Sequence, residues 1–220
     1  MRLNKYIAQS TGLSRRAADD AILRNRVRVN GREPSAGQQV GDGDTVTLDN
    51  SAITPPVNTT TIMLNKPVGY VCSRDGQGSR TIYELIPESL HALKPIGRLD
   101  KESSGLLLMT TDGALAQQLT HPKYHKDKTY QILLDKPLAP LHRQMISDHG
   151  ISLEDGISQL QLDRLHDGDD TQWQVTMHEG RNRQIRRTFE AIGYHVRKLH
   201  RTGFGSYTLG SLESGTHVRL

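Results

Sequence analysis

The stretch of sequence that most constrains this protein is residues 95–113, which read PIGRLDKESSGLLLMTTDG. A carboxylate, Asp100, stands in a polar loop shortly before the apolar run 106–109. Such a run between polar residues is typical of a buried strand. Gly97 and Gly105 allow the backbone to turn on either side of the loop, and Arg98 lies two residues before the carboxylate. The stretch therefore predicts a buried strand with an Asp-bearing loop at its start.

Two interpretations of Asp100 follow from the residues alone. An aspartate held near an arginine stays ionised and can act as a nucleophile or a base. Loop aspartates also commonly cap turns, and without further information this second role is the commoner one.

Residues 61–220, on both sides of this stretch, predict one α+β domain. Strands are expected at 62–64, 106–109, 129–135 and 172–177, and helices at 113–121 and 182–192. Short strands interspersed with two helices favour a mixed or antiparallel sheet.

The helix expected at 182–192 carries charged residues close to its core face. Ile185 faces the core, so Arg186 lies beside that face and is partly buried, whereas Arg183 projects outward. A partly buried arginine needs an anionic partner, and Asp100 is the candidate. The alternative is a surface helix with ordinary solvated arginines.

The N-terminal residues 1–48 predict a separate small α-α-β unit. Gly12 suits the end of a first helix, Ser14 suits the cap of a second, and the alternating run 45–48 suits a strand. Residues 49–60 are rich in Pro, Ser, Thr and Asn, which is typical of a linker. The expected architecture is therefore a small N-terminal domain, a linker at 49–60, and a larger domain at 61–220.

Positive charge is concentrated in two regions, although the net charge is only +4. Residues 1–32 hold eight Lys or Arg against two acids, and residues 178–201 hold seven against two. This distribution favours contact with a polyanion at two places, the alternative being two solvated faces. Arg15 and Arg16 stand at the start of the second helix against the helix dipole, which makes them candidates for binding phosphate. The acidic stretch 154–170 is expected to face away from such a partner.

Several classes of protein are disfavoured by what the sequence lacks. It has no apolar run long enough for a membrane span and no leader-like apolar segment near its start. The single cysteine, Cys72, cannot form an internal disulfide, so a cytoplasmic location is expected. His121 and His125 are four residues apart, but Pro122 between them breaks a helix, so no metal site is predicted. No Walker loop or dinucleotide-binding fingerprint is visible, so no cofactor is expected.

The block 97–100, Gly-Arg-Leu-Asp, resembles the signature of the RsuA/RluB/RluE/RluF family of ribosomal RNA pseudouridine synthases. In that family the Asp is essential for catalysis. Residues 63–70, 128–130 and 179–187 resemble three further motifs of the family in the same order, and residues 1–48 resemble an S4 RNA-binding domain. The resemblance thus covers nearly the whole chain and identifies 61–220 as a catalytic domain of this type.

Two positions depart from the family pattern. Ser103 stands where Thr is usual, and Thr188 stands where Met is usual. Neither residue has an assigned chemical role, although Thr188 is expected to alter local packing.

The resemblance implies an isomerase that breaks the C1′–N1 bond of a uridine, turns the uracil and rejoins it through C5, without metal or cofactor. Asp100 would act at the ribose as a nucleophile or base, and Arg186 would pair with it. Tyr130 would stack on the flipped uracil, with Ile185 packed beneath it. Arg98 would contact phosphate or fill the gap left by the base. Lys128 completes the expected substrate pocket.

The expected partner is ribosomal RNA, in the form of a structured stem-loop that is either naked or part of a ribosomal assembly intermediate. The cations expected to bind this RNA are Arg2, Lys5, Arg15, Arg16, Arg28, Lys66, Arg183 and Arg187. The run 184–187 favours large-subunit RNA. The protein is expected to be a monomer without membrane contact, because no long apolar seam is visible.

Two other functions compete with this hypothesis. The chain could be a catalytically silent RNA-binding assembly factor on the same scaffold, which the set Asp100, Tyr130 and Arg186 argues against. It could also be a metal-dependent nuclease that uses Asp100 and nearby histidines, which a chelator would inhibit.

Overall fold

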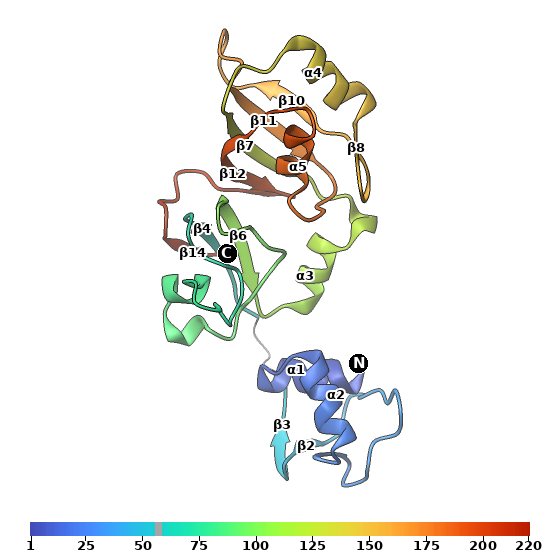
Figure 1. Ribbon diagram of the computed structural model, residues 1–220. Helices are drawn as coiled ribbons and strands as arrows, with labels where there is room; N and C mark the ends of the chain where they lie inside the picture. Colours follow the sequence, from blue (N-terminus) through green and yellow to red (C-terminus); the bar gives the residue numbers. More distant parts are fainter. Residues whose placement is uncertain (56–58) are drawn as a thin grey trace. The chain divides into compact units, whose positions relative to one another are not determined.

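The computed structural model describes residues 1–55 and 59–220, which form two compact units, Met1–Thr59 and Thr60–Leu220. Figure 1 shows the elements of both units. The predicted fold class, a small N-terminal unit followed by an α+β domain, is confirmed. Part of the predicted linker, residues 56–58, lies outside the described residues.

The first unit contains two helices and a small antiparallel sheet in the order β1-β2-β3. Its elements are α1 (Leu3–Thr11), α2 (Arg15–Leu23), β1 (Val27–Val29), β2 (Val46–Leu48) and β3 (Ser51–Ile53). As predicted, Gly12 ends α1 in the left-handed conformation, and the Ser14 hydroxyl caps α2 by accepting from the Ala17 amide at 3.0 Å. Leu3, Ile7 and residues of both helices and β1–β2 form a separate core.

One expectation about this unit is wrong, because β3 lies inside the stretch predicted as a linker. Asp49 and Asn50 both have positive φ angles, 49° and 64°. Two such residues in succession make the kind of tight turn that joins antiparallel strands, and Val46 accordingly pairs with Ile53. The Asp-Asn pair is a turn signal, but the Ser, Thr and Pro residues around it give the stretch the composition of a linker.

The second unit is built on a mixed sheet in the order β10-β11-β7-β12-β6-β4-β14, with β13 added to β12 and β5 to β6. The strands along this order are β10 (Gln161–Arg164), β11 (Gln172–Met177), β7 (Lys128–Leu134), β12 (Val196–Phe204), β6 (Ser104–Thr110), β4 (Thr61–Lys66) and β14 (His217–Arg219). The added strands are β5 (Lys94–Pro95) and β13 (Tyr207–Thr208), and β8 (Ile151–Leu153) and β9 (Gly156–Ser158) form a separate hairpin. Neighbours are antiparallel except β6 and β12, which are parallel.

Helices pack beside this sheet, as Figure 1 shows for α3 along β6 and α5 along β12. They are α3 (Gly113–Thr120), α4 (Pro140–Gln144), which continues into a wider turn at Met145–His149, and α5 (Gln184–Glu190). Short 3₁₀ turns occur at Ile82–Leu85, Glu88–Leu90 and Pro122–Tyr124. The helix expected at 182–192 starts later than predicted, because Arg183 is in the left-handed conformation with φ 48°.

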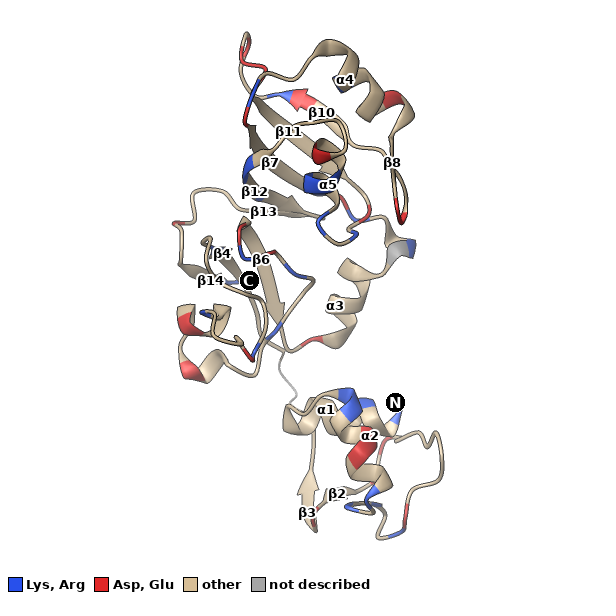
Figure 2. Cartoon of the chain, in the orientation of Figure 1, with Lys and Arg blue, Asp and Glu red and all other residues tan. Residues whose placement is uncertain are grey.

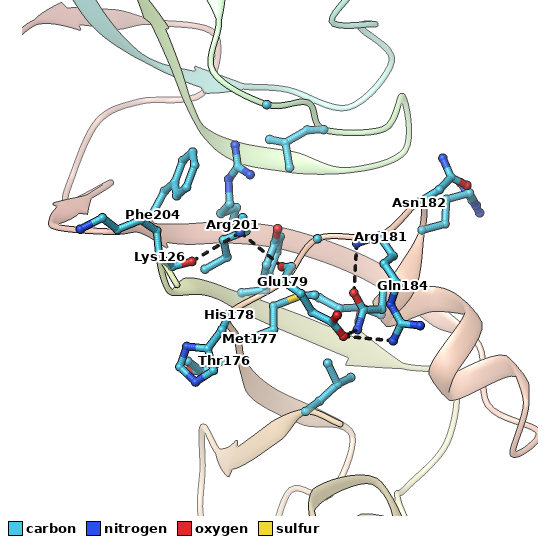
Figure 3. A pocket seen from close by; sticks show the side chains of 18 of the residues that line it. Lys126, Thr176, Met177, His178, Glu179, Arg181, Asn182, Gln184, Arg201 and Phe204 are labelled. Carbon is cyan, nitrogen blue, oxygen red and sulfur yellow. Dashed lines mark hydrogen bonds and ion pairs between the residues drawn. The ribbon is translucent and has the colours of Figure 1, made fainter. Parts of the chain in front are cut away.

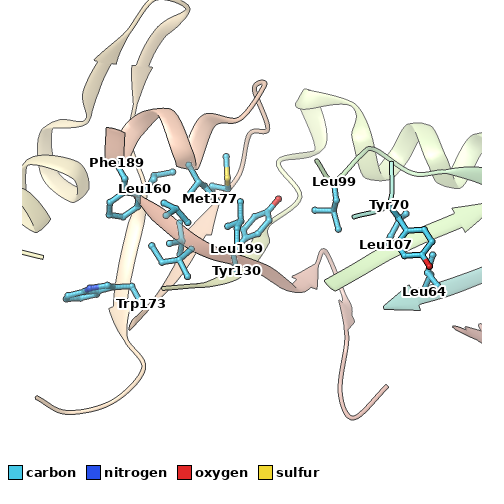
Figure 4. Packing of buried hydrophobic residues seen from close by; sticks show 14 of the residues in the cluster. Leu64, Tyr70, Leu99, Leu107, Tyr130, Leu160, Trp173, Met177, Phe189 and Leu199 are labelled. Atoms are coloured by element: carbon cyan, nitrogen blue, oxygen red, sulfur yellow. The ribbon is translucent and has the colours of Figure 1, made fainter. Parts of the chain in front are cut away.

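The strand β6 is buried on both faces, which explains its unbroken run of apolar residues. Leu107 and Met109 pack into the larger core, whereas Leu106 and Leu108 pack into a smaller one on the other face. Figure 4 shows the larger core, with Leu107 in one group of side chains and Tyr130 at the edge of the other.

Gly105 is required where β6 meets β12. Its φ is +105°, and a Cβ at this position would lie 2.2 Å from the carbonyl oxygen of Arg201. The close approach of the two backbones therefore excludes any side chain. This junction brings the loop that carries Asp100 next to β12, and thereby beside β7.

Candidate active site

A cleft of about 1200 Å³ in the second unit collects most of the residues predicted to act on substrate. Asp100, Arg98, Tyr130, Lys128 and Ile185 all line it. They come from the loop before β6, from β7 and from α5. Segments separated in sequence by about thirty and eighty residues thus meet at one cavity.

The carboxylate of Asp100 is about one third exposed and lies near one guanidinium. Its Oδ2 is 3.8 Å from Nη1 of Arg183, and the same Nη1 is 3.0 Å from Oε2 of Glu102. The hydrogen bond from Arg183 is the main reason why the pKa of Glu102 is lowered. Arg183 therefore shares its charge between two carboxylates of the same loop.

The predicted ion pair between Arg186 and Asp100 is not formed; among the described residues, the guanidinium within 4 Å of this carboxylate is that of Arg183. Arg186 donates instead to the backbone oxygens of Val196, at 2.6 Å, and Glu102, at 3.1 Å. Burial is the main cause that lowers the pKa of Arg186, while the nearby Asp100 and Glu102 carboxylates act in the opposite direction. Arg186 thus ties the Asp100 loop to the start of β12 rather than lining the cleft.

Lys66, expected to bind RNA, is buried, so that prediction is wrong. It is the last residue of β4, and its Nζ donates to the backbone oxygens of Pro67 at 3.0 Å, Asp100 at 3.0 Å and Ser103 at 2.7 Å. Burial is the main cause that lowers the pKa of Lys66. The cation lies beneath the loop that carries Asp100 and fixes its backbone.

A second contact from the same segment also holds this loop. The Cys72 thiol donates to the Leu99 carbonyl at 3.3 Å and accepts from the Leu99 amide at 3.4 Å. The Gly69 amide donates to the Lys101 carbonyl at 2.7 Å. Residues 66–72 therefore run alongside residues 99–103 and set their course, a role that sequence reasoning missed for Cys72.

Tyr130 is 8% exposed and lies in the middle of the sheet. In β7 it pairs with Val175 of β11 on one side and with Arg201 of β12 on the other. Tyr130 and Ile185 belong to the same apolar cluster and line the same cleft, in keeping with the packing expected between them. In Figure 4 the tyrosine lies on the side of its group that faces Leu99.

The hairpin β8–β9 contributes Ile157 to the cleft wall and is clamped by two arginines. Figure 3 shows one of them, Arg181, bonded to Glu179 at the cleft. Nη1 of Arg181 lies 3.0 Å from Oδ1 of Asp155, and Nη2 of Arg187 lies 2.7 Å from Oδ2 of the same carboxylate. The expectation that Arg187 serves RNA binding is therefore not supported, because its charge is engaged within the protein. Ile157, from the acidic stretch expected to face away from RNA, lines the cleft.

Thr188, where the family pattern has Met, is fully buried in this wall. Its hydroxyl donates to Oγ of Ser158 at 2.7 Å, and Gln184 donates to the same oxygen at 3.0 Å. Where the family pattern has an apolar Met, this chain thus has a polar contact between α5 and β9.

The cations of the first unit lie at α1 and α2 and in the segment between α2 and β2, while β2 and β3 carry none, as Figure 2 shows. Arg2, Arg15 and Arg16 are exposed, and Lys5 is partly so. None of these four forms an ion pair with another described residue, whereas Arg28 lies 3.4 Å from Glu33. The four remain candidates for RNA contact, while the charge of Arg28 is shared with an acid.

No cluster of three or more His, Cys, Asp or Glu side chains among the described residues is arranged to hold a metal ion. None of the helices in the described part of the chain is long and apolar enough to cross a bilayer.

Comparison with known proteins agrees with this architecture. Residues 60–191 match the RNA pseudouridylate synthase family, and residues 1–46 match the S4 domain. The small-subunit pseudouridine synthase A of Haemophilus influenzae is 36% identical over 100% of this chain and 96% of its own length. The large-subunit pseudouridine synthase B of Bacillus subtilis is 36% identical over 97% of this chain and 89% of its own. A solved structure described as a pseudouridylate synthase is 34% identical and superposes with a TM-score of 0.72, covering 100% of this chain and 96% of that one. The chain therefore belongs to the RNA pseudouridylate synthase family and carries an S4 domain at its N-terminus.

Proposed function

We propose that this protein converts a uridine of ribosomal RNA into pseudouridine, with Asp100 as the catalytic carboxylate. The observation that carries the proposal is that Asp100 and Tyr130 line the same cleft and that the guanidinium of Arg183 lies 3.8 Å from the Asp100 carboxylate. Relatives named for both ribosomal subunits support ribosomal RNA as the substrate class.

The reaction requires a base that has left its stack, which costs a few kcal/mol that contacts in the cleft must offset. The flipped uracil would stack on Tyr130, above Ile185. Asp100 would then act at the ribose, either as a nucleophile on C1′ or as a base, while the C1′–N1 bond breaks. The uracil turns and C5 bonds to C1′, which releases Asp100 if it had bonded there. The C5 hydrogen leaves as a proton and N1 takes up a proton, so the product is an isomer of the substrate.

The surrounding cations have different tasks in this proposal. Arg183 is placed to stabilise the Asp100 carboxylate directly. Arg186 holds the loop through the Glu102 carbonyl and adds positive charge from behind it. Arg98 lines the cleft next to Asp100 and would meet phosphate or fill the space that the flipped base leaves.

The RNA surface of the first unit would consist of Arg2, Lys5, Arg15 and Arg16, which suits a structured stem-loop held at two places. We propose that the protein binds its RNA as a monomer. Light scattering of the protein alone and with a short rRNA stem-loop tests this, and a dimeric mass in both would contradict it.

The test of catalysis compares wild type with Asp100→Ala on rRNA labelled with tritium at uridine C5. Wild type should release tritium to water and form pseudouridine, whereas the variant should lose at least about 10³-fold in rate. Affinity of the variant for the RNA should stay within about three-fold, because Asp100 is an anion that adds nothing to phosphate binding. Full activity of Asp100→Ala would refute its assigned role.

The same assay separates the competing functions. A silent assembly factor would bind RNA but release no tritium in the wild type. A metal-dependent nuclease would cleave the RNA and stop on addition of EDTA, whereas the synthase should leave the chain intact.

The target is identified by offering small- and large-subunit RNA, each naked and in ribosomal particles, and then mapping the position of the pseudouridine. The named relatives divide between both subunits at 36% identity, so they do not add to the preference for large-subunit RNA.

A further inference from the structure

Arg201 is a buried cation in the cleft to which the reaction outlined above gives no task. It lies in β12 directly opposite Tyr130, and only 2% of its surface is exposed. Its Nε donates to the Leu106 carbonyl at 2.7 Å, whereas its Nη2 is buried without a hydrogen-bond partner among the described residues. A buried donor without a partner carries a free-energy penalty, so a site of this kind needs an explanation.

Lys128 supplies a second cation at the same end of the cleft. Its Nζ touches two backbone oxygens at long distances, 3.4 Å to Lys126 and 3.3 Å to Glu179. The Phe204 ring lies beside both cations, with its centroid 5.5 Å from Nζ of Lys128 and 5.0 Å from Cζ of Arg201. Figure 3 shows Arg201 and Phe204 at this end of the cleft.

No carboxylate within 4 Å neutralises either cation in the part of the chain that the structure describes. The nearby acids are engaged elsewhere, since Glu179 pairs with Arg181 at 3.0 Å and Asp127 pairs with His178 at 2.6 Å. Burial is the main cause that lowers the pKa of Lys128, and the charge of Arg201 lowers it further. A buried cation and a half-buried one thus lie beside the same ring without a neutralising acid, an arrangement that an external anion would stabilise.

We propose that Lys128 and Arg201 together bind one backbone phosphate of the RNA, close to the nucleotide whose base stacks on Tyr130. This inference rests on the proposed function, because RNA is the polyanion that would enter this cleft. A phosphate presents several acceptor oxygens, which suits an ammonium and a guanidinium that approach from different strands. The position of Arg201 opposite Tyr130 places this charge beside the ring expected to hold the uracil.

The test combines Lys128→Gln with RNA in which single phosphates near the target uridine are replaced by uncharged methylphosphonates. Binding is measured with wild type and variant at every replaced position in the substrate loop. If the contact exists, Lys128→Gln weakens binding about ten-fold, and one methylphosphonate weakens wild-type binding by a similar factor. The two changes together should weaken binding little more than either alone. The slope of log affinity against log salt should also fall by about 0.7 in the variant.

Lys136→Gln is the matched control, because Lys136 is an exposed lysine 4.8 Å from the Tyr194 ring and does not line the cleft. It should leave both affinity and salt slope unchanged. Additive effects of Lys128→Gln and every methylphosphonate would overturn the phosphate site. Pseudouridine formation by wild type on unmodified RNA is measured in parallel, so loss of this site is distinguishable from failure of the proposed function. Arg201→Gln should likewise remove most of the effect of the same methylphosphonate, and Arg201→Lys, which keeps the charge, should retain that effect. A folded Arg201→Gln variant in which this methylphosphonate weakens binding as much as in wild type would exclude Arg201 from the site.

Discussion

The backbone at Asp100 is held by a buried lysine, Lys66, which does not touch the Asp100 carboxylate. Lys66 gives its three ammonium donors to three carbonyls, two of them at residues 100 and 103. Because all three donors are used within the protein, the charge on Lys66 serves the loop and not the RNA. A carboxylate that must lie within bonding distance of C1′ depends on such a fixed backbone.

We expect Lys66→Met to lower the stability of the second unit by about 2–4 kcal/mol, because three carbonyl oxygens lose a charged donor. The rate of pseudouridine formation by the folded variant should fall, while its affinity for RNA stays unchanged. Thermal unfolding, single-turnover kinetics and RNA binding measure the three effects. Lys101→Met is the control, since Lys101 is exposed and its ammonium donates to the Ser79 hydroxyl, at 3.1 Å. A weaker RNA affinity with an intact rate would show that Lys66 serves binding after all.

The role of a single residue could be predicted where a sequence motif indicates it. It could not be predicted where it depends on the direction in which the side chain points. The loop with Asp100 and the strand with Tyr130 could be predicted from the residue pattern, and the roles of both residues from the family resemblance. The choice between Arg183 and Arg186 as neighbour of Asp100 could not, because it depends on the left-handed backbone of Arg183. Lys66 likewise looked like an exposed cation, since a lysine at the end of a strand usually reaches solvent.

At the scale of elements, local signals predicted the helix ends of the first unit but not every strand of the second. Gly12 and Ser14 carry local signals that the structure uses as expected. The central strand β12 was not predicted, although it lies between β7 and β6. Its sequence places Arg, Lys and His among the apolar residues, and its pairing with β7 shifts register twice, so no regular alternation is visible. Tertiary pairing, and not local pattern, makes this segment a strand.

The hairpin β8–β9 depends on the ion pairs of Asp155, and its stability should therefore depend on pH. Hydrogen bonding from Arg187 is the main reason why the pKa of Asp155 is lowered in the folded protein. A lowered pKa stabilises the fold above the ordinary value of about 3.9, and this stabilisation is lost as the pH falls through the lowered value. Asp155→Asn should thus melt below wild type from about pH 7 to 5, and the gap should close below about pH 4. Asp163→Asn, an exposed control, should show no such trend; a gap for Asp155→Asn that is constant with pH would contradict the account.

The start of α2 is the element expected to bind phosphate in the first unit. Arg15 and Arg16 are exposed there, beside backbone amides that a helix start presents to anions. Replacing both with Glu should weaken RNA binding at least about ten-fold and flatten its dependence on salt. Arg24→Glu is the control, because Arg24 follows the other end of α2 and is paired with Asp20 at 3.1 Å. An unchanged salt slope in the double variant would mean that these arginines face only water.

At the scale of the whole molecule, the two units have separate apolar cores. The first is formed by residues of 1–53, and the other two clusters lie entirely within 60–220. The candidate catalytic residues all come from the second unit, whereas four of the candidate RNA-binding cations come from the first. The chemistry is thus assigned to the second unit alone, while both units are assigned contacts with RNA, and linking two weak RNA contacts multiplies their effect.

This division predicts the behaviour of residues 60–220 expressed without the first unit. Because its core is complete, the fragment should unfold cooperatively with a melting temperature close to that of the same unit in the full chain. Its KM for rRNA should rise by about 10²-fold, because the second RNA contact is lost, whereas kcat at saturating RNA should stay within about three-fold. Calorimetry and steady-state tritium release measure both quantities. A fragment that folds but has lost kcat would show that the S4 unit helps to build the active site, and the separation of binding from chemistry would then be wrong.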